Sequence, residues 1–108
     1  MFNNLTSKQM EQLFCLAEES GEVVQAVNKI LRHGYESYSP FDEAKTTNRQ
    51  ALERELGNVY HWIQELADAS DLSMEAIETA AWDKSESCKP FMHHQDESHP
   101  AIKAEMAV

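Results

Sequence analysis

Residues 16–27, LAEESGEVVQAV, and residues 53–66, ERELGNVYHWIQEL, decide the fold of this chain. In both stretches apolar residues recur every three or four positions, which is the period of an amphipathic α-helix. Because residues three or four apart share one face of a helix, polar side chains at the same spacing can aim their oxygens at one point. Two facing helices of this kind would form a site for a hard cation such as Mg²⁺. The oxygen-bearing side chains are Glu18, Glu19 and Glu22 in the first stretch and Glu55 and Asn58 in the second.

The composition favours a single all-α domain. The 108-residue chain has only three glycines and three prolines, with 42% hydrophobic residues, which suits helices better than a β-sandwich or a barrel. A chain of this length leaves much apolar surface uncovered when it folds alone, so we expect a homo-oligomer. The formal net charge of −10 argues against a basic surface that binds nucleic acid. An anionic substrate would therefore need metal ions as intermediaries.

The sequence also indicates a compartment. Cys15 and Cys88 fall within helical patterns and lack any CxxC or Cys/His spacing for zinc, which fits two buried, reduced thiols in a reducing cytosol. The opening MFNNLTSKQM lacks the basic and then apolar pattern of a signal peptide. No run approaches the roughly 20 apolar residues of a membrane span. We therefore expect a cytoplasmic protein without a membrane partner.

The first two predicted helices along the chain are long. Thr6 or Ser7 can cap a helix that runs to about Arg32, and Asn48 can cap a second helix that runs to about Ala69. The apolar stripe of the first helix is wider than a core-facing arc, so this helix is expected to contact more than one neighbour.

A third helix is predicted from its cap Ser73 to about Cys88. The connection SDLS before it is short, which predicts that the second and third helices form an antiparallel pair. After Pro90 the helical period is lost. We expect a helical domain at residues 1–92 and a tail at residues 93–108 that is poorly ordered or docked on a partner.

The segment 33–47, HGYESYSPFDEAKTT, contains turn formers and aromatic rings without a clear period. It is predicted to be an ordered loop, and a loop this long in a small domain is usually functional or disordered. Two roles stay open for its rings, which either plug the end of the bundle or cover a ligand. The rings are Tyr35, Tyr38 and Phe41.

The acidic residues also have an ordinary interpretation. Acidic side chains on a helix normally face solvent, and Glu18, Glu19 and Glu22 lie beside the apolar arc of the first helix. Glu55 is different, because on a helical wheel it falls among apolar residues and requires a compensating group. Either a nearby arginine or a cation shared with the first helix would compensate it.

Gly21 and Gly57 interrupt the two acidic helices. A glycine inside a helix costs about 1 kcal/mol relative to alanine, so each glycine is expected to mark the close approach of another backbone. Both adjoin the acidic clusters, which predicts that the two helices cross there.

The acidic pattern resembles the signature of a known family. EESGE at residues 18–22 and ELGN at residues 55–58 are similar to the EExxE…ExxD signature of the MazG-type, all-α nucleoside triphosphate pyrophosphohydrolases. The similarity extends over LAEESGEVVQAVNKILRHGYESYSPFD, TTNRQALERELGNVY and DKSESCKPFMHHQ, and it looks like a small phage and bacterial branch of that superfamily. The resemblance implies an antiparallel helical bundle, a dimer or tetramer, in a bacterial or phage-infected host cytosol.

The resemblance also implies a reaction and a set of roles. The family cleaves a nucleoside triphosphate between its α and β phosphates, which gives a monophosphate and pyrophosphate. Carried over residue by residue, Glu18, Glu19, Glu22 and Glu55 take the catalytic Mg²⁺-ligand positions, with Mn²⁺ as a possible substitute, and one of them also orients the attacking water. Metal ions neutralise the triphosphate and stabilise the charge of an in-line displacement. The remaining ligand position falls on Asn58.

Asn58 departs from the signature, in which the last acidic residue is aspartate. An amide oxygen can ligate Mg²⁺, but it is neutral, so the site should hold its metals less tightly. Our hypothesis is that Asn58 weakens one metal position without abolishing the fold, which leaves reduced or absent activity open.

Few side chains are available to bind the substrate. In the resemblance Lys84 is the first candidate for phosphate, Lys29 is another, and Trp62 could stack on a base. Each has an ordinary alternative, because surface lysines solubilise acidic helices and aromatic residues at helical spacing often belong to a core. No Glu-x-x-His pair occurs in the chain, which excludes the di-iron bundle proteins.

Three interpretations of the function remain open. The first is a Mg²⁺-dependent nucleotide pyrophosphohydrolase. The second is a degenerate family member that binds nucleotide or metal without turnover, which Asn58 supports. The third is a helical oligomerisation module whose acids only interact with solvent.

Overall fold

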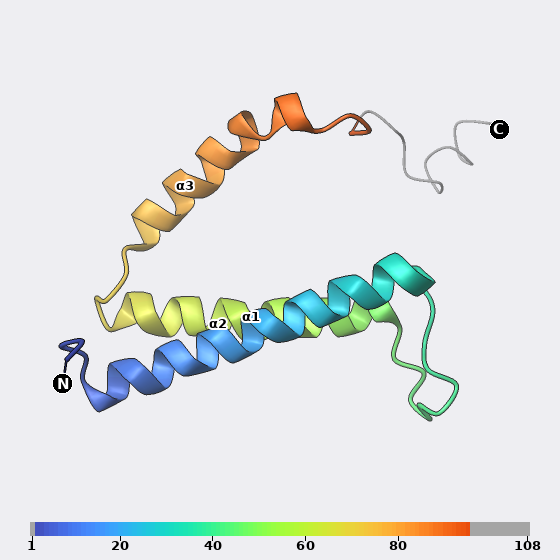
Figure 1. The fold of residues 1–108 in the computed structure, drawn as a ribbon, viewed down its shortest axis with the longest axis horizontal. Helices are drawn as coiled ribbons and strands as arrows, with labels where there is room; N and C mark the ends of the chain where they lie inside the picture. Colours follow the sequence, from blue (N-terminus) through green and yellow to red (C-terminus); the bar gives the residue numbers. More distant parts are fainter. Residues whose placement is uncertain (1, 96–108) are drawn as a thin grey trace. The chain divides into compact units, whose positions relative to one another are not determined.

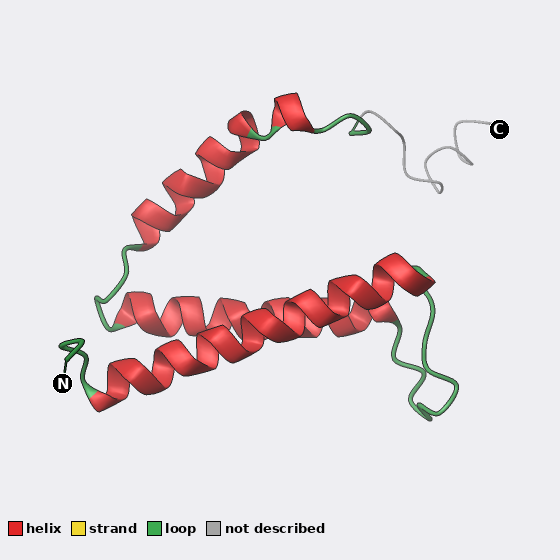
Figure 2. Cartoon of the chain, viewed as in Figure 1, coloured by secondary structure: helices red, strands yellow, loops and turns green. Residues whose placement is uncertain are grey.

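The structure is a computed structural model that describes residues 2–95 of the chain. No strand occurs among these residues, and the prediction of an all-α protein is therefore confirmed (Figure 2). The chain divides between Met74 and Glu75 into two compact units, which are described separately. The elements, labelled in Figure 1, are α1 (Ser7–His33), α2 (Asn48–Asp68), α3 (Met74–Ser87) and a short 3₁₀ turn η1 (Lys89–Phe91).

The two long helices begin with the same capping arrangement. The Thr6 hydroxyl accepts the backbone N–H of Gln9 at 3.1 Å, and the Gln9 side chain accepts the backbone N–H of Thr6 at 2.8 Å. Thr47 and Gln50 repeat this exchange at the start of α2, at 3.1 and 3.0 Å. These bonds satisfy backbone donors that a helix start otherwise leaves open. The predicted cap of the second helix was wrong by one residue, since Thr47 is the cap and Asn48 is the first helical residue.

Helices α1 and α2 pack against one another and form the main part of the first unit (Figure 1). Side-chain hydrogen bonds link them at both ends. Gln9 Nε2 donates to Asp71 Oδ1 at 3.0 Å, and Asn48 Nδ2 donates to the Gly34 carbonyl at 3.1 Å. Because the start of α1 meets the end of α2, and the start of α2 meets the end of α1, the two helices are antiparallel.

The buried core of this unit is small. Leu66, at 1% exposure, and Ala26 are the buried apolar residues among those described, and the polar Gln12 is buried as well. Helix α2 leaves several large apolar residues of α1 uncovered, and the predicted contact of α1 with a further neighbour stays a prediction. The large apolar residues of these two helices that stay exposed are Leu13, Phe14, Val24, Val27, Leu31, Leu56 and Tyr60.

The prediction that the helices cross at glycines was wrong. Gly21 and Gly57 are both exposed, and a Cβ added at either would meet no atom within 4 Å. The small buried residue of α1 is Ala26, one turn after Glu22.

The segment between α1 and α2 is an ordered loop, as predicted. It begins at Gly34, whose positive φ of 90° ends α1 in a conformation that favours glycine. The Arg49 guanidinium forms an ion pair with Glu36 at 2.6 Å and lies 4.3 Å from the centre of the Tyr35 ring. The loop rings do not plug a core, because Tyr35 is half exposed and Phe41 is 93% exposed.

The second unit contains nearly all of α3 and the turn η1. Helix α3 starts directly after the predicted cap Ser73. Its pairing with α2 stays a prediction, and so do the domain at 1–92 and the tail, most of which lies outside the described residues. Cys15 and Cys88 are half-buried, less than expected. Among residues 2–95, no helix has the length and apolar character that crossing a bilayer requires.

Candidate metal centre

Three carboxylates from α1 and α2 come together within the first unit. Glu19, Glu22 and Glu55 each offer one oxygen, and these oxygens lie within 4.8 Å of one another. All three side chains are half-buried. Glu19 and Glu22 are three residues apart, so they share one side of α1. We call these three residues the acid group. The structure thus brings together three of the four glutamates that the sequence marked as ligands.

Glu18 and Asn58 are placed differently from these three. Glu18 is exposed and lies outside the acid group. It precedes Glu19 by one residue, which turns it by about 100° around the helix. Asn58 is half-buried, and its Nδ2 atom donates a long hydrogen bond of 3.5 Å to Glu55 Oε2. In this arrangement the amide nitrogen of Asn58 faces Glu55, so Asn58 orients a carboxylate of the acid group.

The crowding of like charges in the acid group raises the pKa of one member and lowers that of another. A hydrogen bond with Glu55, then one with Glu19, together with the repulsion between these like charges, raises the pKa of Glu22 to about 7. The hydrogen bond from Glu22 lowers the pKa of Glu55, and the positive charge of Arg54 acts in the same direction. Two of these carboxylates therefore compete for one proton, because their negative charges lie too close together to coexist without compensation.

The acid group suits a divalent cation. The Oε2 atom of Glu19 is shielded from solvent and has no hydrogen-bond partner among the described residues. A buried carboxylate oxygen without a partner is unfavourable, and a cation would supply the missing interaction. Carboxylate oxygens are the ligands that Mg²⁺ and Mn²⁺ prefer. Glu19, Glu22 and Glu55 are the residues that would hold the ion.

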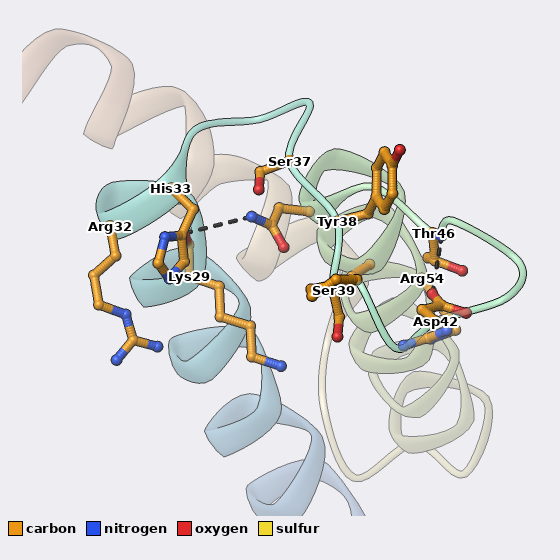
Figure 3. Close-up of a pocket in the computed structure, with 12 residues that line it drawn as sticks. Lys29, Arg32, His33, Ser37, Tyr38, Ser39, Asp42, Thr46 and Arg54 are labelled. Atoms are coloured by element: carbon orange, nitrogen blue, oxygen red, sulfur yellow. Dashed lines mark hydrogen bonds between the residues drawn. The ribbon is translucent and has the colours of Figure 1, made fainter.

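A pocket of about 730 Å³ lies at the loop end of the same helix pair (Figure 3). Residues from the end of α1, from the loop and from the start of α2 line it. Arg54 connects the two regions, since it lines the pocket and its guanidinium nitrogen lies 3.5 Å from Glu55 Oε1. The charged lysine, arginine and aspartate residues of the lining are Lys29, Arg32, Asp42 and Arg54.

The substrate-binding candidates from the sequence are spread over the chain. Lys29 lines the pocket. Trp62 does not, and it lies half-buried two turns after Glu55, with its ring edge-on to His61 at 4.8 Å between centroids. Lys84 is exposed on α3, in the second unit, and its role stays a prediction. Sequence reasoning named Lys29 and Tyr38 but missed the rest of this pocket, including Arg54 as a lining residue.

A comparison with known protein families gave a match that covers both the acid group and the pocket. A family model described as the MazG nucleotide pyrophosphohydrolase domain matches residues 7–93. This match spans all three helices and both acidic segments. The chain belongs to the MazG nucleotide pyrophosphohydrolase family. MazG proteins act on nucleoside triphosphates with divalent metals, and the acid group of this MazG protein offers the oxygens that such metals need. A search of curated proteins and a search of solved structures each gave no match.

Proposed function

We propose that this MazG-family protein is a Mg²⁺-dependent nucleoside triphosphate pyrophosphohydrolase. It would convert a nucleoside triphosphate and water into a nucleoside monophosphate and pyrophosphate. The observation that carries the proposal is the acid group, in which three carboxylates from two helices converge and one buried oxygen of Glu19 lacks a hydrogen bond among the described residues. Family membership supports the reaction class.

The residues of the acid group would have two tasks. Glu19, Glu22 and Glu55 would hold the ion, with Glu18 at the edge of the site and Asn58 orienting Glu55. When bound, Mg²⁺ or Mn²⁺ would neutralise the triphosphate and stabilise the charge that develops during displacement. One of these glutamates would also orient the attacking water.

We also propose that the protein works as a homodimer or homotetramer. The exposed apolar residues of α1 lie mainly on the side away from Glu19 and Glu22, at the three- and four-residue spacing of one helix face. Association of two copies would remove this face from water. It is formed by Leu13, Val24, Val27 and Leu31.

Light scattering across a concentration series tests the assembly. The native chain is expected to have the mass of a dimer or a tetramer, and the double variant Leu13→Lys, Val24→Lys is expected to dissociate. Phe41→Lys is the control, because Phe41 is equally apolar and more exposed but lies in the loop. A native chain that is monomeric at every concentration would contradict the proposal.

Pyrophosphate release from a panel of canonical and modified nucleoside triphosphates tests the reaction. With Mg²⁺ or Mn²⁺ we expect monophosphate and pyrophosphate in equal amounts, and with a chelator we expect neither. Release of orthophosphate would place the cleavage at a different bond. If the metal raises the melting temperature but no product forms, the protein binds metal without turnover. A ligand that binds only the folded state raises its stability.

A further inference from the structure

The loop-end pocket collects positive charge in a chain that is otherwise acidic. Lys29, Arg32 and Arg54 are three of only nine lysines and arginines in a protein with a net charge of −10, and all three line the pocket. Within residues 2–95, neither Lys29 nor Arg32 forms an ion pair. Among the described residues, therefore, no ion pair neutralises these two cations.

One acidic residue, Asp42, also lines the pocket and offsets one of its three positive charges. Its carboxylate accepts the backbone N–H groups of Ala44 at 3.0 Å and of Thr46 at 2.9 Å. These two bonds, with the positive charge of Arg54 adding to them, lower the pKa of Asp42. Asp42 thus shapes the loop, and Arg54 lies near enough for its charge to act on the carboxylate.

Hydrogen bonds hold the loop around the pocket. The Ser37 carbonyl accepts the backbone N–H of Asn48 at 2.9 Å, and Asn48 Nδ2 reaches the Gly34 carbonyl at 3.1 Å. The ion pair between Arg49 and Glu36 fixes the outer part of the loop. A pocket that is already formed loses less conformational freedom when it binds a ligand. Its volume of about 730 Å³ suits a small molecule.

The pocket lies next to the acid group on the same helix pair, on the side of the loop. Lys29 lies seven residues after Glu22, which places it two turns, or about 10 Å, further along the same side of α1. Long side chains on a helix tend to lean toward its N-terminus, which from Lys29 is the direction of Glu22. In Figure 3 the Lys29 side chain extends from α1 toward the loop residue Ser39. On α2, Ala51 of the pocket is one turn before Glu55.

We infer that this pocket is the subsite for the β- and γ-phosphates of the nucleotide, and therefore for the pyrophosphate product, with Lys29 and Arg54 as phosphate ligands and Arg32 at its rim. That the bound polyphosphate belongs to a nucleotide substrate rests on the proposed function. That the pocket binds a polyphosphate at all rests only on the charges of its own residues. In the reaction the water oxygen bonds to the α-phosphorus and gives up a proton to solvent, and the bond from that phosphorus to the α–β bridging oxygen breaks. The bridging oxygen leaves with its electron pair on pyrophosphate, where arginine and lysine donors stabilise the charge.

Binding of inorganic pyrophosphate to the full chain, measured by calorimetry with a chelator present, tests the subsite without the acid group's metal. Lys29→Gln and Arg32→Gln are each expected to weaken binding about fivefold or more, the loss expected for one charge-assisted hydrogen bond at an accessible site. Lys29→Arg should retain most of the affinity. Lys8→Gln is the matched control, because it removes the same charge from the same helix about 30 Å away. Equal weakening by Lys8→Gln, or no change in any variant, would overturn the inference.

Two further comparisons separate this inference from the proposed function. Orthophosphate is expected to bind more weakly than pyrophosphate or inorganic tripolyphosphate, and equal affinity for all three would overturn a polyphosphate subsite. In turnover assays Lys29→Gln should raise both the KM for the nucleotide and the inhibition constant of pyrophosphate. Hydrolysis that needs Glu55 but is unaffected by Lys29→Gln would remove the subsite and leave the proposed function. Pyrophosphate binding that depends on Lys29, in a chain that hydrolyses no nucleotide, would keep the subsite and remove the proposed function.

Discussion

The acid group and the loop-end pocket lie on the same helix pair, yet their chemistry is opposite. Glu19, Glu22 and Glu55 place three carboxylate oxygens within 4.8 Å of one another, whereas the pocket carries the cations of Lys29 and Arg54. A net charge of −10 suggested that only metal ions could bring an anionic substrate to this chain. The comparison teaches that a strongly acidic protein can still concentrate its few cations at one point, so local charge is more informative here than net charge.

The two regions also differ in how they are stabilised. Backbone and side-chain hydrogen bonds hold the pocket, including those that Asp42 and Asn48 make. The acid group is held together although its charges repel, and a proton on Glu22 relieves this repulsion. Changes in metal concentration or pH should therefore affect the acid group strongly and the pocket weakly.

The largest effect is expected from Glu55→Gln, which removes one charge from the acid group without changing its volume. Loss of even an outer partner of a metal site commonly costs about 10- to 100-fold, so we expect turnover to fall by about 100-fold or more. The change should not weaken pyrophosphate binding in the pocket, because it removes the carboxylate charge that pairs with Arg54 at 3.5 Å and leaves that guanidinium to the anion. Steady-state kinetics and calorimetry measure the two effects.

Glu53→Gln is the matched control for this change. Glu53 is exposed on the same helix two residues earlier and does not belong to the acid group. It should keep native kinetics. Retained metal-dependent turnover in Glu55→Gln, or an equal loss in Glu53→Gln, would remove Glu55 from the site.

A smaller effect is expected on the pH dependence of stability. The pKa of Glu22 rises from an ordinary value of 4.5 to about 7 in the folded chain. Between these values the folded state binds more protons than the unfolded state, so the contribution of Glu22 to stability is present below pH 4.5 and is lost as the pH rises through 7. The lowered pKa of Glu55 has the opposite effect, which is lost as the pH falls below 4.5.

Melting temperatures from pH 5 to pH 8 with a chelator test this prediction. We expect the native chain to become less stable toward pH 8, and Mg²⁺ to offset the loss because it binds the folded state. Glu22→Gln should show a flatter profile, whereas Glu18→Gln, which changes an exposed neighbour, should follow the native profile. Parallel profiles for native protein and Glu22→Gln would contradict the raised pKa of Glu22.

Asn58→Asp should have a moderate effect, which is unfavourable without metal and favourable when Mg²⁺ is present. The substitution adds a negative charge and removes the amide donor that faces Glu55 Oε2. Without metal we expect lower stability, and with Mg²⁺ we expect affinity to rise by a few-fold, because the number of charged ligands tunes metal affinity. Calorimetric titration with Mg²⁺ measures the change. Equal rates and equal metal affinity for the two proteins would show that Asn58 does not limit the site.

The smallest effect is expected at the helix starts. Thr6→Ala and Thr47→Ala each remove a capping box, and we expect each to lower the free energy of unfolding by about 1 kcal/mol. Denaturant titration measures both. Thr47 lies between the pocket residues Thr46 and Asn48, so only Thr47→Ala should also weaken pyrophosphate binding. The same weakening in Thr6→Ala would show that the pocket responds to general stability.

The sequence predicted the helices well because their signals are local. Apolar periodicity and caps placed the boundaries of the two long helices within one residue, and helical spacing brought Glu19 and Glu22 onto one side of α1. The glycine prediction failed because a missing side chain does not reveal what lies opposite, and nothing lies near Gly21 or Gly57. The pocket could not be predicted because its lining combines the end of α1, the loop and the start of α2, and sequence periodicity does not show how an irregular loop folds between them.

Paramagnetic broadening by Mn²⁺ in the amide spectrum of the native chain tests the central claim most directly. If α1 and α2 hold a divalent ion between them, substoichiometric Mn²⁺ should broaden the amides around Glu19, Glu22 and Glu55 first, and Glu55→Gln should remove this selectivity. Broadening that spreads evenly over the exposed acidic residues, such as Glu75 and Glu78 of α3, or that persists in Glu55→Gln, would contradict the account.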